Sequence, residues 1–141
     1  MHGGTVKRGG GTVRRKTILI ADGDEEVRRV LSEALNRVGY RVETAERASK
    51  VIHKIQTTKI DVLIMDVGIP DIGGCEMIPI IRNIDPSIPI IILASDSSLE
   101  LAKEVRKEGV FYYALKPLDL EEINLAVQDA CRRVNRKREV K

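Results

Sequence analysis

Five short apolar segments alternate along the chain with longer segments whose apolar residues recur at helical spacing. Apolar residues at i, i+3, i+4 and i+7 are typical of a helix with one buried face. An unbroken apolar run of strand length is typical of a strand buried on both faces, as in a parallel sheet covered by helices. The predicted strands cover residues 17–21, 41–45, 62–65, 89–94 and 110–115, and a predicted helix follows each of them.

The order of these elements predicts the fold class. Strands that alternate with helices are joined by right-handed crossovers, which place the strands side by side in parallel. Gly39 and Gly109 follow the first and fourth predicted helices, and Asp119 precedes the fifth as a predicted N-cap. We therefore expect an α/β protein of the flavodoxin-like (βα)5 type, a doubly wound five-stranded parallel sheet of order 2-1-3-4-5.

Charge separates a body from two basic ends. Residues 1–16 carry a net charge of +5, residues 131–141 carry +5 and residues 17–130 carry −7. We predict one domain at 17–135, a flexible basic Gly-rich leader at 1–16 and a basic tail or linker stub at 136–141. Solvated tails are the favoured interpretation of both ends, and the acidic body argues against nucleic-acid binding by this domain.

Composition excludes other classes of protein. No apolar run approaches the roughly 18 residues that a membrane helix needs, and no apolar stretch follows the charged start as in a signal peptide. Cys75 and Cys131 have neither zinc-binding nor redox spacing. We expect both to be reduced thiols in a cytoplasmic protein with no membrane contact.

Three charged residues stand where predicted strands end. Asp22 follows the first strand, Asp66 the third and Lys116 the fifth. In the order 2-1-3-4-5 the first and third strands are neighbours, and the ligand crevice lies at their carboxyl ends. A single Asp at a strand end is more often a cap, but two at this crevice make Asp66 a candidate site. Lys116 in the same place can also simply form a salt bridge to a neighbouring carboxylate.

This set of groups suits phosphoryl chemistry. Two carboxylates close together are the oxygen ligands that Mg²⁺ prefers. A carboxylate can also attack phosphorus to give an aspartyl phosphate. Phosphoryl transfer then depends on positioning and on neutralising the phosphoryl oxygens, which a metal ion and a lysine can do.

The chain from residue 17 to about 134 resembles the receiver domain of two-component response regulators. The motifs that carry the resemblance are ILIADGDEEVRRVL, LIMDVGIPDIGG and YALKPLDLEEI, in the family's order. The resemblance implies that Asp66 is the phosphoacceptor and Asp22 one of its acidic neighbours. It implies further that Gly68 offers its backbone carbonyl to the metal and that Lys116 pairs with the phosphoryl group. By the same resemblance, the Lys116-Pro117 peptide is cis and Tyr113 occupies the position of the aromatic switch.

The sequence departs from the family pattern at the site itself. Gly23 occupies the position of the second acidic residue, which is usually a direct metal ligand. The position at which the family has a hydroxyl-bearing Thr or Ser is Ala94 in this chain. Ser95 could supply the hydroxyl only if the end of the strand were shifted by one residue. Gly73 stands in place of a further Asp. We therefore expect weak Mg²⁺ binding and slow or weakly coupled phosphorylation.

The leading hypothesis is a receiver that accepts phosphoryl from a histidine kinase or a phosphotransfer protein onto Asp66. By resemblance, its contacts to a downstream protein or a missing output domain would lie around Lys103, Lys107, Tyr113 and Asp119. We expect no enzymatic activity beyond assistance to its own phosphorylation and dephosphorylation. Whether the chain forms a homodimer is left open.

Two alternatives belong to other functional classes. The first is a pseudo-receiver that binds proteins without phosphorylation, which the changes at Gly23 and Ala94 allow. The second is a small flavodoxin-like enzyme or cofactor binder. Against it, the turn after the first strand, Asp22-Gly23-Asp24, is acidic rather than a Gly-rich phosphate loop.

Overall fold

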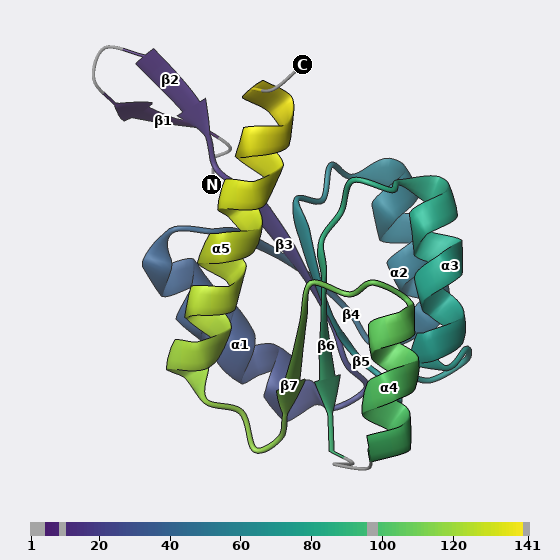
Figure 1. Cartoon of the computed structure of the whole chain (residues 1–141). Helices are drawn as coiled ribbons and strands as arrows, with labels where there is room; N and C mark the ends of the chain where they lie inside the picture. The colour runs from purple at the N-terminus through teal and green to yellow at the C-terminus, as the bar shows by residue number, and fades with distance from the viewer. Residues whose placement is uncertain (1–4, 9–10, 96–98, 140–141) are drawn as a thin grey trace.

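The computed structural model describes residues 5–8, 11–95 and 99–139 of the chain (Figure 1). A five-stranded sheet carries helices on both faces, and the strands of this sheet lie within two residues of their predicted limits. In chain order the elements are β1 (Thr5–Arg8), β2 (Gly11–Arg14), β3 (Thr17–Ala21), α1 (Glu25–Val38), β4 (Arg41–Ala45), α2 (Ala48–Thr57), β5 (Val62–Asp66), α3 (Gly74–Ile84), β6 (Ile90–Ala94), α4 (Leu99–Lys107), β7 (Tyr112–Leu115) and α5 (Leu120–Glu139).

The large sheet is parallel throughout, in the order β4-β3-β5-β6-β7. Counted along the five strands, this is 2-1-3-4-5, which confirms the predicted flavodoxin-like topology. Asp66 is in register with Leu93, and Ala94 with Leu115. The carboxyl ends of the central strands therefore meet at one edge of the sheet, the carboxyl edge, and the opposite edge is the amino edge.

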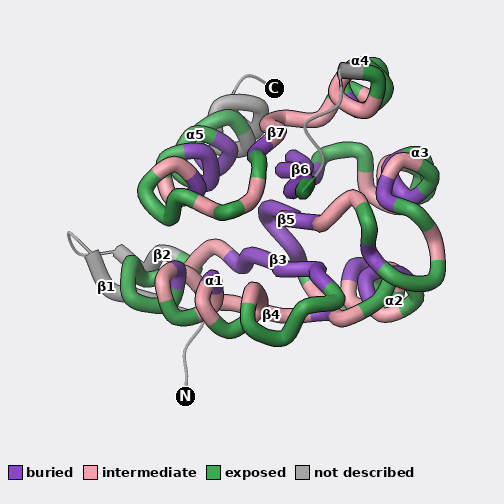
Figure 2. The backbone as a smooth tube through the Cα atoms, turned by 90° about the horizontal axis from the view of Figure 1, so that it is seen from below, coloured by how far each residue is buried: buried purple, intermediate pink, exposed green. Residues whose placement is uncertain are grey.

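Two hydrophobic cores explain the uninterrupted apolar runs. Figure 1 shows α1 and α5 on one face of the sheet and α2, α3 and α4 on the other. Along β5, Leu63 and Met65 pack in the core beneath α2 and α3, whereas Val62 and Ile64 pack in the core beneath α1 and α5. All four side chains are fully buried, as the tube of Figure 2 shows for the central strands. A strand between two such layers needs an apolar residue at every position.

The predicted caps at Gly39 and Asp119 are present, and Asp24 is a further N-cap. The two N-caps lie in loops of the carboxyl edge. Asp24 is the N-cap of α1 and accepts a hydrogen bond from the Glu26 N–H, 2.9 Å away. Gly39 ends α1 in the left-handed region, with φ of 115°. Asp119 accepts from the Glu121 N–H at 3.0 Å at the start of α5. The first turn of each helix is thereby fixed directly after its strand.

Two parts of the predicted leader, residues 5–8 and 11–14, form strands. β1 and β2 pair as an antiparallel hairpin, in which Thr5 is opposite Arg14. Arg14 donates to both oxygens of Asp61, at 3.1 and 2.8 Å, and the Asp61 side chain is only 1 % exposed. Asp61 also accepts from the Thr17 N–H at 2.8 Å. The last residue of the hairpin is thus tied to a buried carboxylate at the amino edge.

The C-terminal helix reaches into the basic segment that follows the predicted domain. α5 continues through Glu139, so no change of structure marks the boundary predicted between residues 135 and 136. Figure 1 shows that its last turns lie at the amino edge, on the side of the hairpin. Among the helices that the structure describes, none has the length and apolarity to cross a membrane.

Candidate functional site

Three charged side chains meet at the carboxyl edge, as the strand pattern predicts. The Lys116 ammonium lies 2.8 Å from Oδ2 of Asp22 and 2.9 Å from Oδ1 of Asp66. Asp22 follows β3, Asp66 ends β5 and Lys116 follows β7, so the three come from widely separated parts of the chain. The salt-bridge interpretation of Lys116 is therefore correct, and it describes the same geometry that brings the candidate site together.

Backbone N–H groups orient both carboxylates. The Asp24 N–H donates to Oδ1 of Asp22 at 2.9 Å, which leaves Oδ2 to Lys116. The Gly68 N–H donates to Oδ2 of Asp66 at 2.9 Å, which leaves Oδ1 to Lys116. In each carboxylate, one oxygen therefore accepts a hydrogen bond from a backbone N–H and the other contacts the Lys116 ammonium. Neither carboxylate is free to rotate.

Burial makes this ion cluster strong. The Asp22 side chain is 3 % exposed, that of Asp66 15 % and that of Lys116 20 %. Burial by itself lowers the pKa of Lys116, but the hydrogen bonds and negative charges of Asp22 and Asp66 outweigh it and the pKa is raised. Lys116 is therefore a permanent positive charge beside the candidate phosphoacceptor.

The residues present fit a magnesium site with two carboxylates. Mg²⁺ in proteins is usually bound by one or two carboxylates and keeps several waters. Asp22 and Asp66 supply the two carboxylates, and Gly68 lies against Asp66 through its N–H. The described part of the chain has no group of three or more His, Cys, Asp or Glu side chains that could hold a metal ion. A third acidic ligand is thus not provided by a residue elsewhere in the described chain.

Gly23 leaves a narrow space where an acidic side chain is expected. A Cβ built on Gly23 would lie 3.1 Å from Cδ and 3.2 Å from Cγ of Pro70. Of the neighbouring acids, Asp24 is engaged in capping α1 and Glu25 is an exposed residue of that helix. The structure therefore gives no sign that either replaces the missing ligand.

The predicted switch positions lie beside the cluster. Ala94 is fully buried at the end of β6, and its carbonyl accepts from the Lys116 N–H at 2.8 Å. Ser95 is exposed just after the strand. Tyr113 is half-buried in β7 and packs against the core beneath α2 and α3. Lys103, Lys107 and Asp119 are exposed on α4 and before α5, so side chains of the predicted output face are accessible.

Several residues that hold this edge together are not apparent from sequence spacing. Asp71 has a φ of 83°, and its carboxylate accepts from the Ser49 hydroxyl at 2.9 Å. The Pro70 carbonyl accepts from the Ala48 N–H at 3.0 Å. The loop after Asp66 therefore caps α2, whose own N-cap residue makes no side-chain cap bond. No local pattern links these positions, because the partners lie more than 20 residues apart.

Close backbone packing fixes the other end of the same loop. A Cβ on Gly74, the first residue of α3, would lie 2.6 Å from Cα of Val67. The Gly74 N–H donates to the Val67 carbonyl at 2.9 Å. Only glycine allows α3 to begin this close to the residue that follows Asp66.

This geometry and the match to a family model identify the class of protein. Residues 18–128 match the response regulator receiver domain family, and the chain belongs to that family. It is a receiver domain of two-component response regulators of the NtrC-like kind. Receiver domains generally bind Mg²⁺ and interact with histidine kinases and output domains.

Individual relatives support this assignment. The chain is 38 % identical over 114 residues to a "DNA-binding transcriptional regulator NtrC" of Azospirillum brasilense, covering 81 % of this chain and 24 % of that protein. It is 32 % identical over 124 residues to the "Regulatory protein AtoC" of Escherichia coli K12, covering 88 % and 27 %. The chain thus spans about a quarter of the length of these relatives.

Solved structures share the same fold. The beryllofluoride-activated NtrC4 receiver domain dimer has a TM-score of 0.79 and 26 % identity, over 84 % of this chain and 98 % of that one. The chemotaxis response regulator CheY4 of Vibrio cholerae has a TM-score of 0.76 and 28 % identity, over 82 % and 98 %.

Proposed function

We propose that this receiver domain accepts a phosphoryl group on Asp66 from a histidine kinase or a phosphotransfer protein. The observation that carries the proposal is the position of Lys116, whose ammonium contacts both Asp66 and Asp22 at hydrogen-bond distance. A nucleophilic carboxylate held against a fixed cation is the arrangement that phosphoryl transfer requires.

In the proposed reaction, a carboxylate oxygen of Asp66 attacks the phosphorus of a phosphohistidine. The new P–O bond forms as the P–N bond breaks, and the imidazole nitrogen keeps the bonding electron pair. The ring leaves as neutral imidazole when its other nitrogen carries a proton. The Gly68 N–H and Lys116 hold the attacking carboxylate in place, and Lys116 stabilises negative charge on the phosphoryl oxygens.

Asp22, Asp66 and the Gly68 carbonyl would hold Mg²⁺, and the ion would supply further neutralisation of the phosphoryl oxygens. We propose that affinity for the ion is low because Gly23 supplies no carboxylate. The domain has no substrate of its own in this proposal, and its only chemistry is on Asp66.

Intact-mass spectrometry after incubation with acetyl phosphate and Mg²⁺ tests the proposal. Wild-type protein should gain the mass of one phosphoryl group, and Asp66→Asn should not. Asp24→Asn is the matched control, because it changes an exposed carboxylate at the same edge and retains a good N-cap. An adduct that persists in Asp66→Asn, or no adduct under any condition, contradicts phosphorylation of Asp66.

A second candidate function is a phosphorylation-independent binding platform. Gly23 and the buried methyl group of Ala94 favour it, since both positions lack groups used in switching. Titration with Mg²⁺ and beryllofluoride, followed by amide NMR, separates the two candidates. Changes in the amide chemical shifts of Tyr113 and of residues along α4 and α5 would support a phosphorylation switch. An unchanged spectrum would support the binding platform.

We propose that signalling, in either case, proceeds through protein contacts on the face formed by α4, β7 and α5, to a downstream protein or to an output domain of a longer chain. Dimerisation is a further candidate, since the NtrC4 receiver structure is described as a dimer. Analytical ultracentrifugation with and without beryllofluoride tests it.

A further inference from the structure

Positive charge gathers at the amino edge, where the hairpin leads into β3, α1 ends, β4 begins and the last turns of α5 lie. Six basic residues there, which we call the basic edge, are Arg14, Arg15, Lys16, Arg37, Arg41 and Arg132. They belong to the end of β2 and its link to β3, to α1, to β4 and to α5. The cluster therefore results from the fold and not from a single run of charge in the sequence.

Contacts between these segments place the basic residues on one surface. The Arg41 N–H donates to the Lys16 carbonyl at 2.9 Å, which joins the starts of β4 and β3. Tyr40 and Cys131 both pack in the core beneath α1 and α5. Burial raises the pKa of Cys131, and the nearby charge of Lys16 opposes this rise. Burial also raises the pKa of Tyr40, and the nearby charge of Arg132 opposes it. Lys16 and Arg132 therefore lie close to neighbouring side chains of the same core.

Three arginines of the basic edge have no carboxylate partner in the described chain. Arg15, Arg37 and Arg41 form no ion pair with any of the carboxylates that the structure describes. Arg37 and Arg41 are exposed, and Arg15 is half-buried. The dipole of α1 favours a cation in its last turn, which accounts for Arg37 without any ligand. That explanation does not extend to Arg15 and Arg41, which lie at the starts of strands.

Two carboxylates pair with residues of the basic edge, and the surface stays positive. Asp61 is buried and bound by Arg14, whose own side chain is still 43 % exposed. Asp129 lies 3.0 Å from Arg132, but their side chains are 60 % and 64 % exposed, so this pair is weak in water. Six cations against these two carboxylates leave a surplus of four positive charges.

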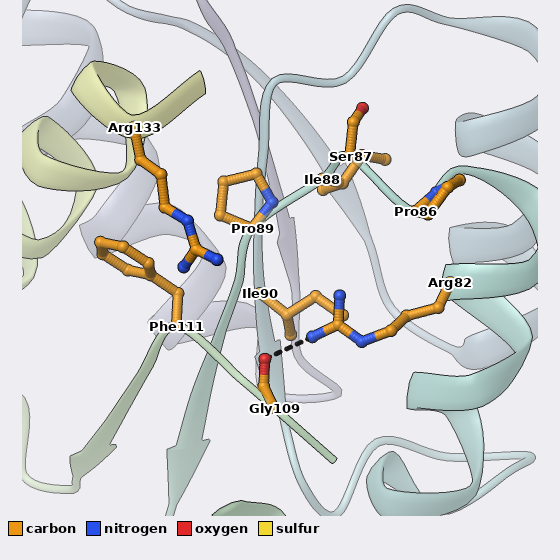
Figure 3. A pocket seen from close by; sticks show the side chains of 9 residues that line it. All are labelled: Arg82, Pro86, Ser87, Ile88, Pro89, Ile90, Gly109, Phe111 and Arg133. Carbon is orange, nitrogen blue, oxygen red and sulfur yellow. Dashed lines mark hydrogen bonds between the residues drawn. The ribbon is translucent and has the colours of Figure 1, made fainter. Parts of the chain in front are cut away.

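Two further arginines continue the positive charge along the amino edge toward β6 and β7. The Arg133 guanidinium lies 5.5 Å from the centroid of the Phe111 ring, a cation–π distance. The Arg82 guanidinium donates to the Gly109 carbonyl at 2.6 Å (Figure 3). Both groups are thus engaged within the chain. They add to the positive potential of this edge, but the proposed contact does not depend on them.

Negative charge lies at the opposite edge. Residues 22–26, 66–76 and 116–122 follow three of the strands and carry ten carboxylates, with Lys116 as the one base among them. The five residues of β3, which separate the two edges, span roughly 16 Å. Exposed charges act over only about 10 Å in 0.1 M salt. The net charge of the body argues against nucleic-acid binding, but a ligand at the amino edge is screened from most of these acids.

The chemistry of the basic edge favours phosphate groups on a rigid double helix. Five of its six residues are arginines, whose guanidinium groups donate paired N–H bonds to phosphate oxygens. Single-stranded nucleic acid is bound largely by base stacking, yet the chain has one Phe, three Tyr and no Trp. A membrane surface is bound by apolar side chains as well as by charge. Of the large hydrophobic residues exposed in the described chain, only Val38 adjoins the basic edge.

We propose that the basic edge binds the phosphate backbone of double-stranded nucleic acid. Contacts to phosphates carry no sequence information, so this binding is not sequence-specific. Figure 1 shows the hairpin and the last turns of α5 at the same end of the domain. Residues 5–8 and 136–138 of these elements include five further basic residues, so both elements extend the contact along a duplex. The surface is separate from Asp66, and binding does not require phosphorylation.

Fluorescence anisotropy of the full chain with a labelled DNA duplex of mixed sequence tests the proposal. We expect saturable binding with a dissociation constant of about 1–100 μM at about 50 mM salt. Because the basic edge displaces counterions from the duplex, the logarithm of affinity should fall with the logarithm of salt concentration, with a slope of about −3 to −5. Asp66→Asn should bind as wild type does. Affinity that does not depend on salt, or no binding to a second duplex of unrelated sequence, would overturn the proposal.

Two double variants assign the surface. Arg37→Gln with Arg41→Gln removes two exposed cations that have no carboxylate partner. It should weaken binding about tenfold or more and make the salt slope shallower by about 2. Arg29→Gln with Arg47→Gln is the matched control, because it removes two exposed arginines outside the basic edge with the same change in net charge. The control should bind as wild type does, and equal weakening by the two double variants would overturn the proposal.

Sedimentation with vesicles of phosphatidylcholine and phosphatidylserine compares the duplex with a membrane surface. The protein should bind the duplex more tightly than the vesicles, because the basic edge lacks exposed apolar side chains that insert among lipids. Tighter binding to the vesicles would overturn the proposal and assign the basic edge to an anionic membrane.

Discussion

Pro70 lies against Gly23, so that a Cβ on the glycine would come within 3.1 Å of the proline ring. The two residues belong to the loops that follow β3 and β5, and the contact closes the space in which a second acidic ligand is expected. The missing carboxylate and the packing of the site are therefore linked.

This contact leads to the first prediction. Gly23→Asp should raise Mg²⁺ affinity, because it adds a carboxylate beside Asp22, and should lower the free energy of unfolding by roughly 1–2 kcal/mol through crowding. Calorimetric Mg²⁺ titration and urea unfolding measure the two effects. Gly23→Ala should show the crowding without the gain in affinity, and adding Pro70→Ala should restore stability. Equal Mg²⁺ affinity of the Asp and Ala variants would contradict the prediction.

Loss of the central cation should be costly. Lys116→Met retains the aliphatic stem but leaves Asp22 and Asp66 facing each other without compensation, and we expect a loss of about 2–3 kcal/mol in urea unfolding. Lys54→Met is the matched control, because the Lys54–Glu43 pair is shorter, at 2.6 Å, yet more exposed. It should lose less than about 1 kcal/mol. Similar losses in both variants would mean that burial does not strengthen the central cluster.

If the proposed phosphorylation switch operates, a hydroxyl at position 94 should strengthen it. Ala94→Ser adds a donor at the end of β6, beside the strand end that carries Asp66, with little added volume. We expect beryllofluoride to produce larger amide NMR shifts at Tyr113 in this variant than in wild type. The reason is that the added hydroxyl can donate a hydrogen bond to beryllofluoride bound at Asp66 but has no such acceptor in the unbound domain. Ser95→Ala should not change the response. If Ser95→Ala instead abolished it, the exposed serine would be the switch group.

The hairpin anchor should contribute to stability. Arg14→Ala removes both hydrogen bonds to the buried Asp61 carboxylate, and we expect a loss of about 1–2 kcal/mol in urea unfolding. Arg29→Ala removes exposed ion pairs with Glu26 and Glu33 on α1 and should lower the free energy of unfolding by less than Arg14→Ala does. Equal effects would show that the hairpin is not anchored through Asp61 in solution.

Stability should fall at alkaline pH. Burial is the main cause that raises the pKa of Cys131 from 9.0 to about 11 and that of Tyr40 from 10.0 to about 12. The unfolded chain therefore ionises first, so these groups contribute fully below about pH 9 and the contribution is lost as pH rises toward about 12. Urea unfolding at about pH 8 and pH 11 should show this loss. Cys131→Ala and Tyr40→Phe should each lose less than wild type between the two values.

The sequence predicts the fold and the central site because their signals are local. Apolar runs such as residues 62–65 need burial on both faces, and Asp22, Asp66 and Lys116 follow their strands directly. The hairpin was not predicted because its strands have only four residues each and lie in a glycine-rich segment, and because its anchor, Asp61, is distant along the chain. The same holds for the cap that Asp71 provides to α2 and for the contact of Pro70 with Gly23. In both cases the partners are far apart in the sequence, and no local sequence pattern links them.

The tethered hairpin and the long α5 lie at the amino edge, across the sheet from Asp66. A polypeptide attached beyond the hairpin or beyond α5 would therefore start at the amino edge, remote from Asp66. On the proposed function, such an attachment would leave Asp66 accessible to a phosphodonor. A structural change caused by phosphorylation would then have to pass through the domain to reach that polypeptide, because the two are not in direct contact.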